Sequence, residues 1–464
     1  MATKKTPNFK DLRYIINPKS VAIIGASDIP DKIGHIILEN YIDAGYGGAL
    51  YPVNTKGSPT IMGLKAYKSV LDIHKSIDLA VIAIPAPYVP EVLEECGKAH
   101  VKSTIVVSSG FAEVGNTDLE NQIKEISEKY NMPMLGPNCL GVVNLKARTN
   151  TMFLPSFKLD IPKIGGVSFV SQSGAIGSTL LDLIAHEGFG LSKFISYGNA
   201  TDIDEIDILN YLMHDKDTKV IVLYIEGVKR GPEIIELGKK ITKIKPVIVI
   251  KGGMTDAGVQ AAHSHTASLT SSFEAYSAAF KQAGFIVAED IQDLLDLSKI
   301  FQMKKKVAGD RVAIITDGGG AGVLTTDAIS NAGLKIAELS EDSKKQLREA
   351  MPPIVNIRLP LDIGGDADDS RYSKALEVLT KDSNVDVILV IVLFQTPGAD
   401  SRVAATVVHY GVVSEKPIIA ISIGGNYTLV HKTIMESSGI PVYDSPRAAA
   451  KAISAFVKYS TFKV

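Results

Sequence analysis

One histidine, His265, stands among residues that suit group transfer. It lies in the stretch AAHSHTAS at residues 261–268, where its neighbours are small or carry hydroxyls. An apolar run at 246–250 comes shortly before it and is typical of a buried parallel strand. Parallel sheets place their chemistry at the carboxyl ends of such strands, and a neutral imidazole is nucleophilic near pH 7. We therefore expect an open imidazole that can accept a phosphoryl group; the plain alternative is a loop histidine that caps a helix.

Two further groups could serve this histidine. Glu226 ends the apolar run at 220–225, so its carboxylate would reach the same sheet edge and could hold the proton on one imidazole nitrogen. The sequence SQSGA at 171–175 precedes a helical pattern, whose first amides attract anions. This predicts a phosphate-binding turn made by Ser171, Ser173, Gly174 and Ala175. The alternatives are a solvated glutamate and a serine N-cap without a ligand.

Composition narrows the class of protein. The 464 residues allow about two to four domains, and a net charge of -2 favours neither nucleic acid nor membrane as a partner. Two cysteines without a CxxC motif predict no disulfide framework and no thiolate metal site. The N-terminus shows no secretory signal and the longest apolar run, 387–394, is too short to cross a bilayer. We therefore expect a soluble, cytoplasmic protein.

The same local pattern occurs three times along the chain. A short apolar run that ends in small residues is followed by a helical pattern at 21–27, 166–174 and 311–320, and further apolar runs follow each of them. Such alternation predicts an α/β protein with three consecutive Rossmann-like or flavodoxin-like, doubly wound parallel sheets. Polar stretches near 146–163 and 299–310 predict domains at 1–150, 151–305 and 306–464.

The first of these units has the turns of a ligand pocket. Gly25 and Ser27 follow its first strand, and the amides of such a turn attract phosphate. The spacing is not GxGxxG and no acid follows the second strand, which opposes a nicotinamide dinucleotide; Lys56, found there instead, suits a phosphorylated ribose. Turns at 84–87, 108–113 and 136–139 follow other strands, and together they predict a pocket rim. Each turn alone could be purely structural.

Other polar residues carry no predicted chemistry. The acidic residues at 202–207 are typical of a helix start, and Cys139 is expected to be a packed residue because no histidine lies near it in sequence. The glycine-rich turns at 318–322, 362–366 and 424–426 offer neither a general base nor a nucleophile to the third unit.

Taken together, these motifs resemble the α subunits of the ADP-forming acyl-CoA synthetases, such as archaeal acetyl-CoA synthetase, and more distantly the succinyl-CoA synthetase α chains. The resemblance runs from about residue 18 to 459. It is carried in order by residues 25–34, 51–54, 109–111, 136–139, 171–174, 198–199, 224–226, 251–253 and 264–266. Two departures stand out: Ala267 occupies a position that is glycine in the family loop, and RLPLD at 358–362 replaces an Asn-Pro-x-Asp turn.

The resemblance implies a reaction and a set of ligands. Acyl-CoA, phosphate and ADP would give carboxylate, coenzyme A and ATP through an acyl phosphate, with His265 phosphorylated and Glu226 orienting it. Coenzyme A would bind the first domain around Gly25, Ser27, Lys32, Pro52, Lys56, Pro85 and Ser109. A separate β subunit with an ATP-grasp domain would bind most of the ADP or ATP with Mg²⁺, in an α2β2 assembly, and the third domain would contact other subunits.

Three rival functions predict different properties. A non-catalytic CoA-binding scaffold would bind CoA without phosphoryl transfer, and Ala267 is the one residue that favours it. An oxidoreductase would need the missing acidic residue after the second strand. A succinyl-CoA ligase α chain would end after the second unit, whereas this chain continues through a third.

Overall fold

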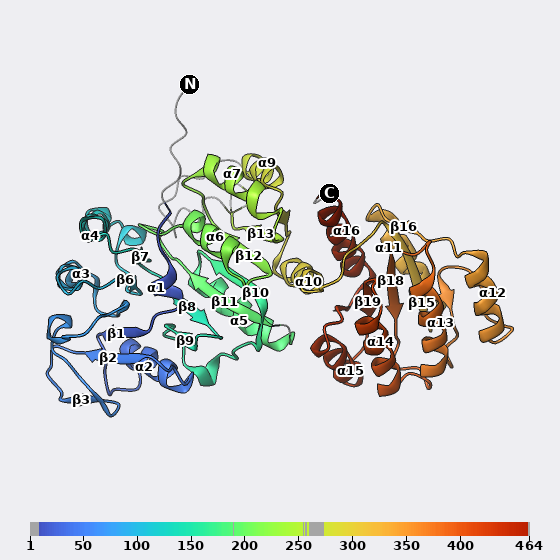
Figure 1. Ribbon diagram of the computed structural model, residues 1–464, viewed down its shortest axis with the longest axis horizontal. Coiled ribbons are helices and arrows are strands. Elements are labelled where there is room, and N and C mark those ends of the chain that lie inside the picture. Colours follow the sequence, from blue (N-terminus) through green and yellow to red (C-terminus); the bar gives the residue numbers. More distant parts are fainter. Residues whose placement is uncertain (1–8, 189, 254, 256–257, 259–272, 463–464) are drawn as a thin grey trace, which may run out of the picture. The chain divides into compact units, whose positions relative to one another are not determined.

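The computed structural model describes residues 9–188, 190–253, 255, 258 and 273–462. The chain forms two compact units: unit 1 holds Met1–His186 and Gly190–Val287, and unit 2 holds Glu187–Phe189 and Ala288–Val464. Unit 1 contains two parallel sheets and unit 2 contains a third, so the predicted α/β fold with three parallel-sheet domains is confirmed (Figure 1).

The first sheet has five parallel strands in the order β2-β1-β5-β6-β7. They are β1 (Ser20–Ile24), β2 (Ala49–Val53), β5 (Leu79–Ile82), β6 (Ser103–Val106) and β7 (Met134–Leu135). The helices of this part are α1 (Arg13–Ile16), α2 (Ile33–Asp43), α3 (Val89–Lys98) and α4 (Thr117–Tyr130), and a small hairpin joins β3 (Thr60–Ile61) to β4 (Leu64–Lys65). The connections from β1 and β5 leave in opposite directions, so the carboxyl ends of these two strands border a switch-point crevice, the usual ligand position of such sheets.

The second sheet runs in the order β14-β13-β12-β10-β11-β8-β9. Its strands are β8 (Gly141–Asn144), β9 (Thr149–Asn150), β10 (Ile164–Ser171), β11 (Leu191–Ser196), β12 (Val220–Ile225), β13 (Val247–Lys251) and β14 (Ile286–Val287). Its helices are α5 (Gly174–His186), α6 (Glu205–His214), α7 (Gly231–Ile241) and α9 (Phe273–Ala283). Strands β8 and β9 are antiparallel additions at one edge. The switch point of this sheet lies between β10 and β12.

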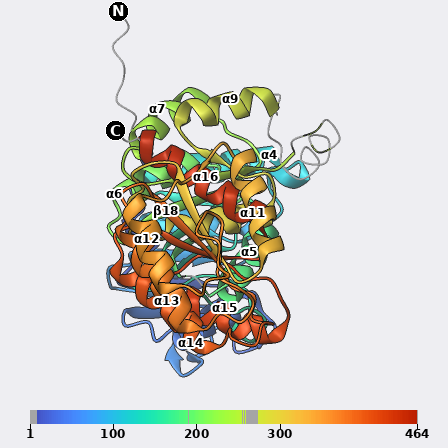
Figure 2. The ribbon, with the colours of Figure 1, turned by 90° about the vertical axis from the view of Figure 1, so that its right-hand side faces the viewer.

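The third sheet, in unit 2, repeats the same order as β16-β15-β18-β19-β20, with β17 also paired to β15. Its strands are β15 (Arg311–Thr316), β16 (Lys335–Ile336), β17 (Leu361–Asp362), β18 (Val387–Ile391), β19 (Ile418–Ile421) and β20 (Val442–Tyr443). The helices are α10 (Ile291–Phe301), α11 (Gly319–Asn331), α12 (Glu341–Ala350), α13 (Asp369–Lys381), α14 (Ser401–Val413), α15 (Asn426–Ser437) and α16 (Pro446–Phe462). Helix α11 packs with α16, whereas α12 to α15 pack in series, so the two groups cover opposite faces of the sheet (Figure 2).

Burial explains which strands were visible in the sequence. Strands β1, β5, β12 and β18 are apolar along almost their whole length because helices cover both faces of these sheets, and they lie where the apolar runs predicted. Strand β11 was missed because Lys193 interrupts its apolar run. That lysine is buried and its Nζ forms an ion pair with Asp215 at 2.6 Å.

The chain passes from the first sheet to the second between β7 and β8. The first sheet ends at Leu135, and the next strand, β8, already pairs with β11 of the second sheet. The domain division at 1–150, 151–305 and 306–464 stays a prediction. Helices η1 (Val70–Asp72), η2 (Ala86–Tyr88), η3 (Ala112–Val114) and η4 (Ser156–Lys158) are short 3₁₀ turns in unit 1.

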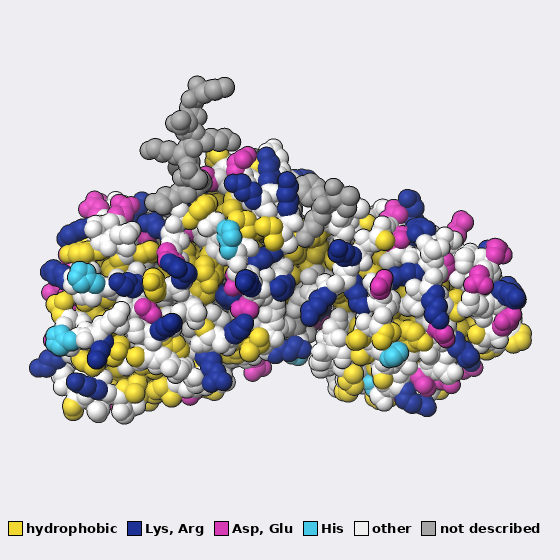
Figure 3. Space-filling model, viewed as in Figure 1, with side chains coloured by type: hydrophobic (Ala, Val, Ile, Leu, Met, Phe, Trp, Pro, Cys, Tyr) yellow, Lys and Arg dark blue, Asp and Glu magenta, His cyan; other side chains and the backbone are white. Residues whose placement is uncertain are grey.

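The surface mixes both signs of charge. On the face shown in Figure 3, Lys and Arg side chains are scattered over both units, with fewer Asp and Glu side chains among them. Among the residues that the structure describes, no helix has the length and apolar character needed to span a membrane.

Candidate active site

The switch point of the first sheet is built by two glycines. Gly25 follows β1 with φ +95°, and a Cβ there would lie 2.4 Å from the carbonyl oxygen of Ala83, just beyond β5. Gly34 lies in the first turn of α2, where a Cβ would be 2.0 Å from the carbonyl oxygen of Gly25. Neither position accommodates a side chain without a backbone shift. The helix start therefore sits directly against the turn, as in sheets that hold phosphate at this place.

Polar residues surround this turn. The Asn54 side-chain amide donates to the carbonyl oxygen of Ala26 at 2.6 Å, which ties the end of β2 to the turn. Its oxygen accepts from the Lys56 amide at 2.8 Å. Ser27 is half-buried, whereas Lys32, at the N-cap of α2, and Lys56 are exposed. Both cations are thus available to an anionic ligand at this edge.

The remaining predicted CoA residues fall on neighbouring strands. Pro52 is buried within β2, Pro85 is exposed in the turn after β5, and Ser109 is exposed after β6. The Ser108 hydroxyl donates to the carbonyl oxygen of Ile84 at 2.5 Å, so these two turns are joined. The structure brings all the predicted residues except Pro52 to the turns at the carboxyl edge of the first sheet.

The switch point of the second sheet holds Glu226. The Gln172 side-chain oxygen accepts from the backbone amides of Glu226 at 2.8 Å and Gly227 at 3.1 Å. The Gln172 backbone amide donates to the carbonyl oxygen of Tyr224 at 3.1 Å. Gln172 follows β10 and Glu226 follows β12, so one buried side chain binds the two strand ends together. This places Glu226 beside the predicted phosphate turn, whose residues Ser171 and Ser173 stand on either side of Gln172.

The surroundings of Glu226 contain a phenol and an ammonium group. The Tyr224 hydroxyl donates to Glu226 Oε1 at 3.4 Å, and burial together with the Glu226 charge raises the pKa of Tyr224 to about 12. Lys251 is only 3% exposed; burial lowers its pKa although the Glu226 charge opposes this. A Cβ on Gly252 would lie 3.5 Å from Glu226 Cγ. The chain that leaves β13 toward His265 therefore starts beside this carboxylate.

The predicted phosphate turn begins helix α5, and the Ser173 hydroxyl accepts there from the Ile176 amide at 3.5 Å. The buried Ser171 hydroxyl donates to the carbonyl oxygen of Ser173 at 2.6 Å and shapes the turn. That carbonyl oxygen also accepts from Gly177 at 3.0 Å, which closes the first turn of α5. Gly174 is half-buried and Ala175 is exposed. The first amides of a helix have no partner within it, so this turn can hold an anion.

Several predictions concern other residues. His265 lies outside the described residues, as do all of 259–272. Cys139 is buried as expected, and burial raises the pKa of its thiol to about 12. Asp204 is the N-cap of α6, in agreement with the predicted acidic helix start, and it also forms an ion pair with Arg230. Within the described ranges, no group of three His, Cys, Asp or Glu side chains is placed to hold a metal ion.

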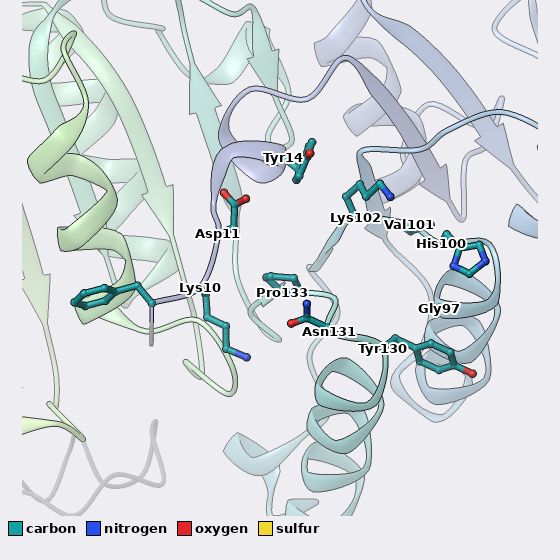
Figure 4. A pocket seen from close by; sticks show the side chains of 11 residues that line it. Lys10, Asp11, Tyr14, Gly97, His100, Val101, Lys102, Tyr130, Asn131 and Pro133 are labelled. Carbon is teal, nitrogen blue, oxygen red and sulfur yellow. The ribbon is translucent and has the colours of Figure 1, made fainter. Parts of the chain in front are cut away.

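Two cavities lie away from these switch points. One of about 600 Å³ lies at the amino ends of β6 and β7, where side chains from the N-terminal segment and from the turns before these strands converge (Figure 4). A second, of about 470 Å³, is lined by residues of α3 and α4 and by Pro87 before α3. Pro87 of the predicted rim turn at 84–87 lines the second cavity, but none of the residues predicted to bind CoA or phosphate lines either one. The candidate site therefore rests on the geometry of the strand ends.

Gln172 is a candidate site residue that its local sequence does not indicate, although it stands inside the SQSGA motif. Its role depends on β12 being the neighbour of β10, and this adjacency has no local signal in the sequence. The contacts of Asn199 with Glu113 and Glu120 likewise have no local signal in the sequence.

Family models match the three sheets in turn. A CoA binding domain matches residues 19–144, a succinyl-CoA ligase like flavodoxin domain matches 164–301, and a Ligase-CoA domain matches 312–445. Fold, switch-point turns and matched domains together define an acid–thiol ligase that acts with coenzyme A.

Relatives place the chain more narrowly. The acetate–CoA ligase (ADP-forming) I subunit alpha of Pyrococcus furiosus is 41% identical over 97% of this chain and 98% of its own length. The acetate–CoA ligase (ADP-forming) of Methanocaldococcus jannaschii is 43% identical over 98% of this chain. The solved acetyl-coenzyme A synthetase 1 of Candidatus Korarchaeum cryptofilum, in complex with phosphate and ADP, superimposes with a TM-score of 0.92 at 35% identity, covering 98% of this chain and 97% of that one. This chain belongs to the α-subunit family of the ADP-forming acetate–CoA ligases, which is related to the succinyl-CoA ligase α chains.

The relatives differ in length. The chain spans 64% of the Methanocaldococcus jannaschii relative, whereas it spans 97% and 98% of the two Pyrococcus furiosus α subunits. The name "subunit alpha" carried by the shorter relatives implies a partner subunit.

Proposed function

We propose that this chain is the catalytic α subunit of an ADP-forming acetyl-CoA synthetase, which converts acetyl-CoA, phosphate and ADP reversibly to acetate, CoA and ATP. The acyl group is taken from the names of its relatives. One observation carries the chemistry: Gln172 joins Glu226 to the Ser173 turn, and the chain that bears His265 leaves the same sheet edge. The Glu226 carboxylate and the helix start at Ser173 thus lie at the sheet edge where the chain leaves β13.

The proposed steps use these groups in order. A phosphate oxygen attacks the thioester carbonyl, the C–S bond breaks and CoA leaves as the thiol, which gives acetyl phosphate. A nitrogen of His265 then attacks phosphorus, the P–O bond to the acetyl group breaks and acetate leaves. Glu226 stabilises the imidazolium that develops, and amides of the Ser173–Ala175 turn hold the phosphoryl oxygens. Transfer from His265 to ADP completes the cycle.

We propose that coenzyme A binds at the switch point of the first sheet. The turn at Gly25 and Ser27 offers backbone amides, and exposed Lys32 and Lys56 offer charge to the phosphates of CoA. The same edge includes Pro85 after β5 and Ser109 after β6, and Pro52 lies within the neighbouring strand β2. A diphosphate with a phosphorylated ribose suits this cationic edge better than an unphosphorylated dinucleotide, since no acid follows β2 to hold a ribose diol.

The rest of the cycle needs a partner. We propose a β subunit with an ATP-grasp domain, in an α2β2 assembly, which binds most of the ADP with Mg²⁺. The relatives named "subunit alpha" and the greater length of the Methanocaldococcus jannaschii relative support this.

Helix α15 supports a subunit contact on the third domain. Its exposed side chains are all uncharged, and Tyr427, Leu429, Val430 and Ile434 are among them, with Val430 59% exposed. The polar residue Lys432 instead points inward and is buried. This reverses the usual pattern of a surface helix, and an apolar exposed face of this kind is typical of interaction surfaces.

The test is phosphate labelling of the complex reconstituted with its native partner. Labelled ATP with Mg²⁺, or labelled phosphate with acetyl-CoA, should phosphorylate this chain, and His265→Ala should abolish the label. His263→Ala is the matched control in the same stretch and should keep it. Glu226→Gln should slow labelling while leaving CoA affinity unchanged. A label that persists in His265→Ala would contradict the assignment of His265. A separate screen of carboxylates as substrates tests the identity of the acyl group.

A further inference from the structure

The Gly198-Asn199 motif is one part of the resemblance to which no function has been given. It follows β11 of the second sheet but lies against the first domain. A Cβ on Gly198 would be 2.3 Å from the carbonyl oxygen of Pro137, and the Asn199 amide donates to the same oxygen at 3.0 Å. The Thr201 amide donates to the carbonyl oxygen of Gly136. A loop of the second domain thus completes the carboxyl edge of the first.

The Asn199 side chain is hydrogen-bonded to two glutamates that hold the turn after β6. Its Nδ2 donates to Glu113 Oε2 at 2.6 Å and to Glu120 Oε2 at 2.8 Å, which uses both of its hydrogens. Glu113 Oε1 accepts from the amides of Gly110 at 2.5 Å and Phe111 at 3.2 Å. Glu120 Oε2 accepts from the next amide along, at 3.0 Å. Two carboxylates therefore hold the backbone of the 110–112 turn, directly after Ser109. The Asn199 amide joins these two carboxylates to each other, and Glu120 Oε1 also accepts from the Thr201 hydroxyl at 2.7 Å.

The backbone of the same loop is tied to the other half of the site. The Lys229 ammonium donates to the carbonyl oxygens of Asn199 at 3.2 Å and Ala200 at 3.0 Å. Lys229 follows Glu226 by three residues in the loop after β12. A continuous series of hydrogen bonds therefore runs from the turn after Ser109 through Asn199 to the loop after Glu226.

We propose that Asn199 is a positioning residue that holds the CoA-side turn at 109–112 in register with the strand end that carries Glu226. The inference rests on the proposed function, in which the thioester on one domain must meet phosphate on the other. Misplacement of reacting groups by about 1 Å can cost about 100-fold in rate, so two half-sites on separate domains need such a tie.

The chemistry of the contact selects asparagine. Burial alone would raise the pKa of Glu113, but hydrogen bonds from Asn199 and from the amides of Gly110 and Phe111 outweigh it and lower that pKa. An alanine would leave the Glu113 and Glu120 carboxylates facing each other without this donor. An aspartate would add a third negative charge, and only its protonated form could donate.

The experiment uses the complex with its partner and compares Asn199→Ala and Asn199→Asp with wild type. Asn116→Ala is the matched control, because the Asn116 side chain donates to Gly110 on the same turn at 2.9 Å but lies wholly in the first domain. The readouts are phosphorylation from ATP without CoA, KM for CoA and kcat in acetyl-CoA synthesis, and the Kd for CoA by calorimetry.

For Asn199→Ala we expect normal phosphorylation from ATP and a loss of about 10- to 100-fold in kcat/KM for CoA. Asn116→Ala should stay within about twofold of wild type, because the cross-domain tie remains. Asn199→Asp should recover part of its activity relative to wild type as the pH falls and its carboxyl takes up a proton. That recovery separates a positioning role from general damage to the fold.

Three results overturn the inference: an Asn199→Ala enzyme with unchanged kcat/KM, an equal loss in Asn116→Ala, or a parallel loss of phosphorylation from ATP. If the wild-type complex is not phosphorylated from ATP, the proposed function is wrong, but this result alone does not decide the role of Asn199. The Kd for CoA then decides the inference, and equal values for wild type and Asn199→Ala overturn it.

Discussion

Glu205 permits a quantitative test of the packing in unit 1. It lies in the first turn of α6, is 2% exposed, and its Oε1 has no hydrogen-bond partner within the described part of the chain. Burial, reinforced by the charge of Asp204, raises the pKa of Glu205 from 4.5 to about 8. The folded protein therefore keeps a proton at neutral pH that the unfolded chain has released.

The sign and size of the effect follow from this difference. Below pH 4.5 the Glu205 carboxyl is protonated in both the folded and the unfolded protein, so its titration does not change the free energy of unfolding. Between pH 4.5 and about 8 the free energy of unfolding falls steadily as the pH rises. Each pH unit in that window removes about 1.4 kcal/mol. At pH 7 the carboxyl has thus lowered the free energy of unfolding by about 3 kcal/mol relative to acid.

Glu205→Gln removes the titration and keeps the shape. Urea or thermal unfolding of both proteins from pH 5 to 8 should show that wild type loses about 3 kcal/mol more than the variant over this range. Glu236→Gln, at an exposed position on α7, is the control and should follow wild type. Parallel curves for wild type and Glu205→Gln would refute the reasoning.

Three further changes test other parts of the molecule. Gln172→Ala leaves the half-buried amide of Glu226 and the buried amide of Gly227 without an acceptor. We expect the free energy of unfolding of unit 1 to fall by about 2 kcal/mol and phosphorylation to slow about tenfold or more, checked by unfolding and labelling. Gly34→Ala forces the helix start away from Gly25; a strain of about 1–3 kcal/mol should weaken CoA binding roughly 10- to 100-fold in calorimetry while phosphorylation from ATP persists. Cys139, with its thiol pKa of about 12, should resist iodoacetamide at pH 8 until the protein is unfolded, and rapid native alkylation would contradict its burial.

The sequence predicted most of the fold because long buried strands leave a strong apolar signal. Strands such as β12 and β18 lie where their runs predicted, whereas the two-residue strands β16, β17 and β20 are too short to be seen. The interrupted strand β11 was missed through the single buried charge of Lys193.

The candidate site was predicted where it depends on strand ends and missed where it depends on sheet order. Gly25 and Glu226 each follow an apolar run, so their place at a sheet edge could be inferred locally. Gln172 and Asn199 act across strands or domains that are far apart in sequence, and their partners are set by which strands become neighbours. Residues of this kind can be identified only once the topology is known.

The central claim is that the phosphoryl group passes through His265. Phosphorylate the complex from ATP, digest this chain with trypsin, and fragment the peptide that spans residues 252–281, which contains both His263 and His265. We predict an acid-labile phosphate on His265, lost when acetate and CoA are added. A phosphate on any other residue, or one that acetate and CoA do not discharge, would contradict the account.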